Sequence, residues 1–351
     1  EPIYQRNGGF HYARQFATAA WQLPGLGLPD APVQAGPHDV FFTADLALLP
    51  IAAMHEPLRA LRAQGVPINF VLHDLIPVFH PEFYQGEVDP RFVRWLEIVF
   101  DVADQVLCVS RSVAAELQAW LATHPAQAPA RAPRIGWFHL GADLDEPGAP
   151  APAAARAGIE LACRTPQTHT FLMVGTIEPR KGHEQVLDAF ERLWAAGADV
   201  NLVIIGKAGW NVKHVVDRLR AHPQAARRLC WLERACDATL SEAYSMASAL
   251  IAASHAEGFG LPLIEAAQHG LPVIARDLPV FREVAGAHAH YFTADTPAEL
   301  ARAIEAWTAL QRQGLAPGSA AMPYLTWAQS AEQVARAILP GIQARTDAGL
   351  R

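Results

Sequence analysis

The chain has 351 residues, of which 51% are hydrophobic and 18% charged, and its formal net charge is −7. This length exceeds what one hydrophobic core usually holds, so we expect two domains; the composition excludes a disordered chain, and the lack of any run of about 18 apolar residues excludes a membrane-spanning one. Residues 1–150 hold 9 basic and 16 acidic residues and carry the whole negative excess, which argues against a nucleic-acid partner.

The four cysteines indicate a reducing setting. They form no C-x-x-C pair and are too few for a disulfide framework, so we expect a cytoplasmic protein. No signal-peptide pattern opens the chain, and it begins with Glu1 rather than Met, which is the pattern expected of a piece of a longer protein. The cysteines are Cys108, Cys163, Cys230 and Cys236.

The first half alternates apolar strands with helical patterns. A glycine turn at 6–10 is predicted to lead into a helix from about 11 to 20, and Gly9 could cradle a phosphate or a sugar there, although a glycine pair is more often a plain turn. Apolar strands that alternate with helices favour parallel βαβ units in a doubly wound sheet. The strands are predicted at 39–43, 68–72, 105–109 and 134–140, and the helices between them near 55–64 and 91–102.

Two polar pairs follow predicted strands of the first half. His73 and Asp74 come after the strand at 68–72, and ligands bind beyond the carboxyl ends of such strands, so both are candidates for substrate contact. The alternative is that Asp74 organises a turn while His73 satisfies a backbone group. Asp143 and Asp145 could hold a metal, but the Pro- and Ala-rich residues behind them favour a linker, so we expect no metal.

The second half repeats the alternation. Strands are predicted at 170–174, 200–205, 230–233, 249–253 and 272–275, and the last of them closes the series. Helices are predicted at 186–194, 297–313 and 327–344, whereas 277–283 favours caps and turns.

A glycine-flanked loop at 175–182 joins the first of these strands to a helix. It contains Arg180 and Lys181, adjacent cations that suit a diphosphate because they offset its charge without a metal. Solvated surface charge is the alternative. Lys207 follows the next strand and is a candidate for contact with a phosphate or a sugar, with plain surface charge equally open.

The stretch 257–265 places two carboxylates around a glycine loop that turns into a helix. We expect free N–H groups on Leu263 and Ile264 at the helix start, which favour an anionic or polyhydroxylated ligand. Glu257 and Glu265 would repel a phosphate, so neutral diols suit them better. A sugar nucleotide supplies one diol on its sugar and one on its ribose, with a diphosphate between them. The alternative is that both are ordinary helix-terminus acids.

This arrangement resembles a known family. Glu257-x7-Glu265 with Gly-Phe-Gly-Leu-Pro between, preceded by the loop at 175–182, is similar to retaining family 4 glycosyltransferases over about 40–295. The resemblance implies an α/β GT-B fold, in which two Rossmann-like, doubly wound domains face a cleft. The expected parts are an acceptor-side domain at 1–150, a linker at 151–168, a nucleotide-sugar domain at 169–325 and a C-terminal helix at 326–351 that crosses back to the first domain.

The resemblance also implies roles for individual residues. Glu257 would contact hydroxyls of the donor sugar, Glu265 would bind the ribose, and Arg180 and Lys181 would hold the diphosphate. Thr176 stands where many members carry arginine, so Lys207 is expected to replace that contact. The remaining expected contacts are the backbone of Gly258, Phe259, Gly260 and Leu261 along the sugar and phosphate, His73 with Asp74 at the donor sugar, and Gly9 in the glycine turn of the first domain.

The loop at 175–182 together with His73-Asp74-Leu75 is most similar to bacterial mannosyl- and rhamnosyltransferases that build surface polysaccharide or LPS. The resemblance implies that a hexose passes from a nucleoside diphosphate sugar, without a metal or other cofactor, to a saccharide or lipid-linked oligosaccharide acceptor, with retention at the anomeric carbon. A weak peripheral association with the inner membrane, and partner domains or enzymes of the same pathway, stay open. The alternatives are a sugar-nucleotide epimerase, a phosphorylase or a non-catalytic binding module.

Overall fold

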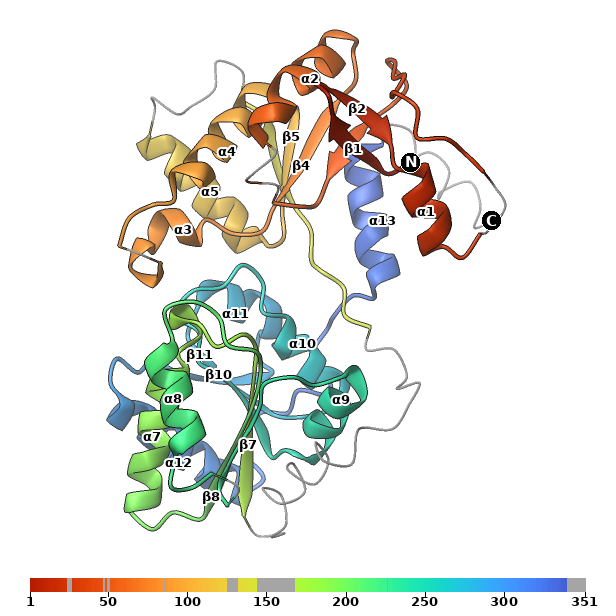
Figure 1. Cartoon of the computed structure of the whole chain (residues 1–351). Coiled ribbons are helices and arrows are strands. Elements are labelled where there is room, and N and C mark those ends of the chain that lie inside the picture. The colour runs from red at the N-terminus through yellow and green to blue at the C-terminus, as the bar shows by residue number, and fades with distance from the viewer. Residues whose placement is uncertain are drawn as a thin grey trace, which may run out of the picture. The chain divides into compact units, whose positions relative to one another are not determined.

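The chain divides into two compact units, each with its own parallel sheet (Figure 1). Unit 1 comprises Glu1–Val78, Val88–Phe138 and Ala331–Arg351, and unit 2 comprises Phe79–Glu87 and His139–Ser330. Of the expected linker at 151–168 only the last residue is described, and Asp145 is not described. The computed structural model describes residues 1–23, 27–46, 48, 51–84, 86–124, 132–143, 168–225 and 227–339.

Unit 1 is built on a four-stranded parallel sheet. In spatial order its strands are β3 (Phe41–Thr43), β4 (Ile68–Leu72), β5 (Gln105–Cys108) and β6 (Arg134–Trp137). Its helices are α2 (Ile51–Ala63), α3 (Ile76–Phe79), α4 (Pro90–Val102) and α5 (Arg111–Thr123). The 3-10 turn at Pro81–Phe83, between α3 and α4, is part of unit 2. All residues of β4 and β5 are buried, as expected for a parallel sheet covered on both faces.

The N-terminus forms a hairpin rather than the expected turn into a helix. Strands β1 (Ile3–Arg6) and β2 (Gly9–Tyr12) pair antiparallel, and helix α1 (Arg14–Ala20) begins only after them. The predicted helix is present, but its predicted start near residue 11 was wrong. The reason is the Asn7-Gly8 pair, whose φ angles of 50° and 79° make the two-residue turn that matches the twist of a hairpin.

Unit 2 contains a six-stranded parallel sheet. Its strands are β7 (His169–Val174), β8 (Val200–Ile205), β9 (Leu229–Leu232), β10 (Ala249–Ala252), β11 (Val273–Arg276) and β12 (Ala289–Phe292). In space the order is β12-β11-β10-β7-β8-β9, so the chain runs outward from β7 to β9 and then returns to the other side of β7. Ligands of open parallel sheets bind beyond the carboxyl ends of the strands at such a reversal, here between β7 and β10.

Helices cover both faces of this sheet (Figure 1). Helices α7 (His183–Ala195), α8 (Lys213–Ala221) and α12 (Pro297–Arg312) lie on one face, where their apolar sides join Phe171 and Trp307 in the core. Helices α9 (Asp237–Met246), α10 (Leu261–Gln268) and α11 (Pro279–Ala285) lie on the other. Two predictions were wrong here: 277–283 contains most of α11, and β12 follows β11 as a further strand.

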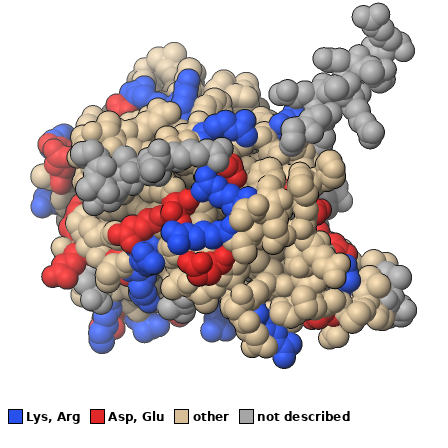
Figure 2. All heavy atoms as spheres, turned by 90° about the horizontal axis from the view of Figure 1, so that it is seen from above, with Lys and Arg blue, Asp and Glu red and all other residues tan. Residues whose placement is uncertain are grey.

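A final helix, α13 (Trp327–Ile338), follows unit 2 in the sequence, and its residues from Ala331 onward are part of unit 1. None of the helices in the described ranges is both long and apolar enough to cross a membrane. Acidic and basic side chains interleave on the face drawn in Figure 2. This face therefore shows no broad basic patch among the described residues.

Candidate functional site

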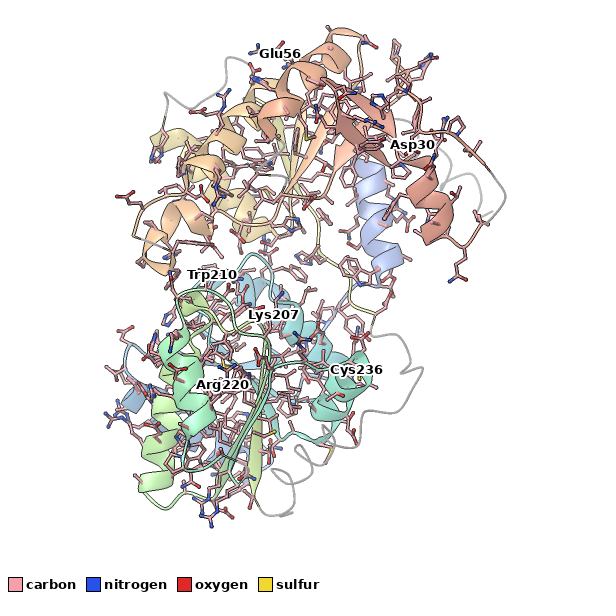
Figure 3. All side chains as sticks on the ribbon, in the orientation of Figure 1. Asp30, Glu56, Lys207, Trp210, Arg220 and Cys236 are labelled. Carbon is pink, nitrogen blue, oxygen red and sulfur yellow. The ribbon has the colours of Figure 1, made fainter. Side chains whose placement is uncertain are left out.

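Two loops at the carboxyl ends of β7 and β8 are paired with each other. The N–H of Ile177 donates to the carbonyl of Lys207 at 2.9 Å, and the N–H of Gly209 donates to the carbonyl of Ile177 at 2.9 Å. Thr176 is half-buried beside Gly209, whereas Lys207 is exposed. Figure 3 shows Lys207 at the same end of unit 2 as Trp210. Both predicted contacts, Thr176 and Lys207, thus belong to one loop pair beside the sheet reversal.

Glu257 follows β10 and is held by two cations. Its Oε2 accepts a hydrogen bond from Nη1 of Arg180 at 2.9 Å, and its Oε1 accepts from Nζ of Lys181 and, at 2.8 Å, from Oγ of Ser254. The side chains of Arg180, Lys181 and Glu257 are only 18%, 14% and 10% exposed. The cations expected to bind a diphosphate are therefore already gathered on one carboxylate.

The electrostatics of this cluster favour the charged form of Glu257. Burial by itself raises the pKa of the Glu257 carboxyl, but the neighbouring Lys181 and Arg180 cations and the hydrogen bonds to Lys181 and Ser254 outweigh burial and hold that pKa below its usual value. Arg180 also forms an ion pair of 2.6 Å with the buried Glu178. Two acids and two cations are thus concentrated where β7 and β10 lie side by side.

Backbone contacts fix the two loops of this cluster against each other. The N–H of His255 donates to the carbonyl of Arg180 at 2.7 Å. Gly182 has φ 76°, and a Cβ added there would lie 2.6 Å from the carbonyl oxygen of Ala253. Arg276 is buried and donates through Nε to the same carbonyl at 3.1 Å and through Nη1 to that of Ala294 at 2.7 Å. The distance between the cations and Glu257 is therefore set by the backbone.

The glycine loop after Glu257 packs closely and leads into α10. Gly260 has φ 101°, and a Cβ there would lie 2.7 Å from the ring of Phe281. The side chain of Phe259 is buried against His139, with ring centroids 5.4 Å apart, so Phe259 offers a ligand only its backbone. One expectation was wrong, because the N–H of Leu263 is not free but donates to the carbonyl of Gly260 at 3.0 Å.

Glu265 lies one helix turn further along α10. Its Oε2 accepts a hydrogen bond of 2.5 Å from the hydroxyl of Tyr244 on α9. Burial raises the pKa of Glu265, and the hydrogen bond from Tyr244 acts in the opposite direction. Glu265 is therefore a partly buried acid with a neutral donor, whereas both oxygens of Glu257 are bound by cations.

Three predicted residues lie in unit 1, and each has at least one contact with the backbone. His73 is exposed at the end of β4, and its Nε2 donates to the carbonyl of Ala44 at 2.7 Å. Oδ1 of Asp74 accepts from the N–H of Ile76 at 3.0 Å. Gly9 pairs with Arg6 in the hairpin. A contact with a sugar stays a prediction for these residues, as it does for the residues of unit 2.

Sequence reasoning missed several contacts of this site. Ser254 stands three residues before Glu257, a spacing that could have suggested it, but no local pattern points to Tyr244 or Arg276 because their contacts come from other elements. Among the described residues, no group of three or more His, Cys, Asp or Glu side chains is arranged to hold a metal ion. Of the acidic pair considered for a metal, Asp143 accepts through Oδ2 from the N–H of Trp327 at 3.0 Å.

Comparison with solved structures defines the class of fold. The chain superposes on the structure of Anabaena Alr3699/HepE in complex with UDP and glucose with a TM-score of 0.62 and 17% identity, covering 85% of this chain and 77% of that one. Sucrose-phosphate synthase from Thermosynechococcus elongatus gives 0.64 and 19%, covering 93% and 75%. The fold is therefore the two-domain GT-B fold, which confirms the expected fold class.

Sequence comparison gives a family match for part of the chain. Residues 164–320 match the family model described as Glycosyl transferases group 1. The serotype-specific mannosyltransferase WbdA of Escherichia coli is 43% identical over 326 residues, which are 92% of this chain and 39% of the relative. The D-inositol 3-phosphate glycosyltransferase of Mycobacteroides abscessus is 28% identical over 60% of this chain and 46% of that protein. Residues 164–320 therefore resemble the group 1 glycosyltransferases, and the chain spans less than half the length of these relatives.

Proposed function

We propose that the chain transfers a hexose from a nucleoside diphosphate sugar to a hydroxyl of a saccharide or lipid-linked oligosaccharide acceptor in the synthesis of a bacterial polysaccharide. The observation that carries the proposal is the cluster of Arg180, Lys181 and Glu257 at the reversal of the unit 2 sheet. A hexose of the mannose or rhamnose type is favoured, because the 43% identity to WbdA, a serotype-specific mannosyltransferase, extends over 92% of the chain.

The cations of this cluster suit the departing diphosphate. Negative charge develops on the leaving group in the transition state, and preorganised cations stabilise it without having to reorganise. In the free protein Arg180 and Lys181 are paired with Glu257. A bound diphosphate would compete for both cations and leave the carboxylate of Glu257 to accept hydroxyls of the donor sugar. Thr176 and Lys207 lie in the neighbouring loop pair and would add phosphate contacts.

The proposed reaction retains the configuration of the anomeric carbon. In a front-face route, the departing phosphate oxygen accepts the proton of the acceptor hydroxyl, so no separate base is needed. The charge of the diphosphate is offset by Arg180 and Lys181, so we propose that no metal is required. Glu265 would accept hydroxyls of the ribose, while His73 and Asp74 would contact a sugar at the carboxyl end of β4.

Replacement of Lys181 tests the proposal. We expect Lys181→Ala to lower turnover by about 10²–10³ at saturating donor, as removal of one preorganised donor does elsewhere. Nucleotide release from GDP-mannose and from other nucleoside diphosphate hexoses would be measured with and without a mannoside acceptor. Lys213→Ala is the matched control, because Lys213 is 89% exposed and pairs with Asp217 on the surface of α8. Unchanged turnover in Lys181→Ala would dispose of the proposal.

The same assay separates the rival functions. An epimerase would convert the donor without an acceptor, a phosphorylase would need inorganic phosphate, and a binding module would bind nucleotide sugar without releasing nucleotide. The anomeric configuration of the product, determined by nuclear magnetic resonance, tests retention. Turnover that survives a chelator would agree with independence from metal, and loss of turnover that added Mg²⁺ restores would contradict it.

A further inference from the structure

Tyr244 and Glu265 form a buried contact between two helices. Tyr244 is 1% exposed on α9, and its hydroxyl donates to Oε2 of Glu265 on α10 at 2.5 Å. A buried tyrosine hydroxyl needs a hydrogen-bond partner, which a backbone carbonyl could supply as well. Here the partner is instead a carboxylate of the candidate site, at the sheet reversal.

His269 holds the tyrosine ring in place from one side. Its ring stacks on that of Tyr244, with centroids 5.3 Å apart and planes inclined by 22°. Nδ1 of His269 donates to the carbonyl of Glu265 at 2.9 Å, and its Nε2 lies 3.0 Å from Oγ of Ser241 on α9. The imidazole is thus bound to both helices, and it limits how far the Tyr244 ring can move.

The contact leaves one carboxylate oxygen of Glu265 available. Each oxygen of an ionised carboxylate can accept more than one hydrogen bond, and Tyr244 takes only a site on Oε2. Within the described part of the chain, no group donates to Oε1. A neutral donor fixes the carboxylate without cancelling its charge, in contrast to the two cations on Glu257.

We propose that Tyr244 is a positioning residue for ribose recognition: it holds Oε2 of Glu265 so that Oε1 faces the ribose diol of the donor nucleotide. This inference rests on the proposed function, which assigns the ribose to Glu265. Tyr244 acts through Glu265 and does not itself touch the nucleotide. Removal of its hydroxyl should therefore weaken the distinction between ribose and deoxyribose, because the carboxylate is then free to rotate.

Calorimetry on the whole chain tests the inference. The probes are GDP and UDP, each compared with its 2′-deoxy counterpart, and the ratio of the two dissociation constants measures ribose recognition. We expect Tyr244→Phe, which keeps the ring and the stack on His269, to reduce that ratio by about 3- to 10-fold. Tyr291→Phe is the matched control, since its hydroxyl contacts the backbone carbonyls of Phe281 and Gly286; its ratio should equal that of the wild type.

A double variant separates positioning from a general structural effect. If Tyr244 acts through Glu265, Tyr244→Phe combined with Glu265→Gln should show the same ratio as Glu265→Gln alone. Replacement of Tyr244 by 4-aminophenylalanine restores an N–H donor and should recover part of the ratio. This last variant also answers the question if Tyr244→Phe does not fold.

The outcomes distinguish the inference from its premise. A wild-type ratio near one would remove the ribose role of Glu265 and the inference with it, while nucleotide release by the transferase assay could still support the proposed function. A wild-type ratio well above one that Tyr244→Phe leaves unchanged would overturn the inference alone. An additive loss in the double variant would also overturn it.

Discussion

His183, next to the loop of Arg180 and Lys181, shows how burial controls the pKa of a single residue. It is the first residue of α7, is 2% exposed, and follows Lys181 by two positions. Neither of its ring nitrogens has a hydrogen-bond partner in the described part of the chain. Burial, helped by the nearby Lys181 cation, lowers the pKa of His183 to about 3. The imidazole therefore stays neutral in the folded protein at any pH above about 3.

This shift makes stability depend on pH. Between the ordinary value of 6.5 and about 3, the unfolded chain binds a proton at His183 that the folded chain does not, so the free energy of unfolding falls as the pH falls through this window. At about 1.4 kcal/mol per pKa unit, the loss attributable to His183 by pH 4 is about 3 kcal/mol. We expect His183→Gln to remove this loss, as measured by urea unfolding at pH 7 and pH 4.

The quantity to compare is the free energy of unfolding at pH 7 minus that at pH 4, because the substitution also changes the absolute stability at each pH. His214→Gln is the control, since His214 is 58% exposed and pairs with Glu184 at 3.2 Å. In His214→Gln, the free energy of unfolding should change between pH 7 and pH 4 by as much as it does in the wild type. If the free energy of unfolding of His183→Gln changes between pH 7 and pH 4 by as much as that of the wild type, the imidazole takes up a proton in the folded state and this account is wrong.

The residues of the candidate site could be predicted from the sequence more readily than their partners. Arg180, Lys181 and Glu257 stand in loops between a strand and a helix, so their local pattern is enough to select them. The hydrogen bond from Tyr244 to Glu265 joins residues 21 positions apart and depends on how α9 packs on α10. Local periodicity contains no information on such a contact.

At the scale of elements, helix α7 lies between two glycines in the left-handed conformation. Gly182 precedes the helix with φ 76°, and Gly197 follows it with φ 82°. A Cβ at Gly182 would lie 2.6 Å from the carbonyl oxygen of Ala253, whereas a Cβ at Gly197 would meet nothing within 4 Å. An L residue would therefore be strained at either position, but only at Gly182 would its Cβ also clash with a neighbouring atom.

This difference predicts unequal costs of two alanine substitutions. We expect Gly197→Ala to lower the free energy of unfolding by about 1–2 kcal/mol, the cost of the left-handed conformation. Gly182→Ala should lower it by about 3 kcal/mol or more, because the clash with Ala253 adds to the strain. It should also weaken nucleotide binding, since it separates the loops of Lys181 and Glu257. Equal costs, measured by chemical denaturation, would contradict this account.

Burial and length largely explain which helices and strands could be predicted from the sequence and which were missed. Buried strands such as β4 and β8 are apolar apart from one asparagine each and were predicted with the observed bounds. The short strand β12 was missed because only its end residues are buried. Helix α8 was missed because it is nine residues long and buries only three of them. The hairpin of β1 and β2 was missed although Asn7-Gly8 is a specific turn signal.

At the scale of the whole molecule, the two units can be followed separately through buried thiols. Cys108 is fully buried in β5 of unit 1, and burial raises the pKa of its thiol to about 12, so it should not react until unit 1 opens. Ala301 is buried on α12 of unit 2, where a cysteine is a small change. A chain with Ala301→Cys and with the other cysteines replaced by serine therefore reports on both units.

We expect a nucleotide to protect only one of these thiols, because all of the residues proposed to bind the nucleotide and the diphosphate lie in unit 2. A ligand at about 100 times its dissociation constant lowers the population of open forms that cannot bind it by about 100-fold. With GDP at that excess, labelling at Ala301→Cys should slow by about 100-fold while labelling at Cys108 stays unchanged, as resolved by peptide mass spectrometry. Equal slowing at Cys108 would mean that the two units open together and that the donor stabilises the chain as one cooperative body.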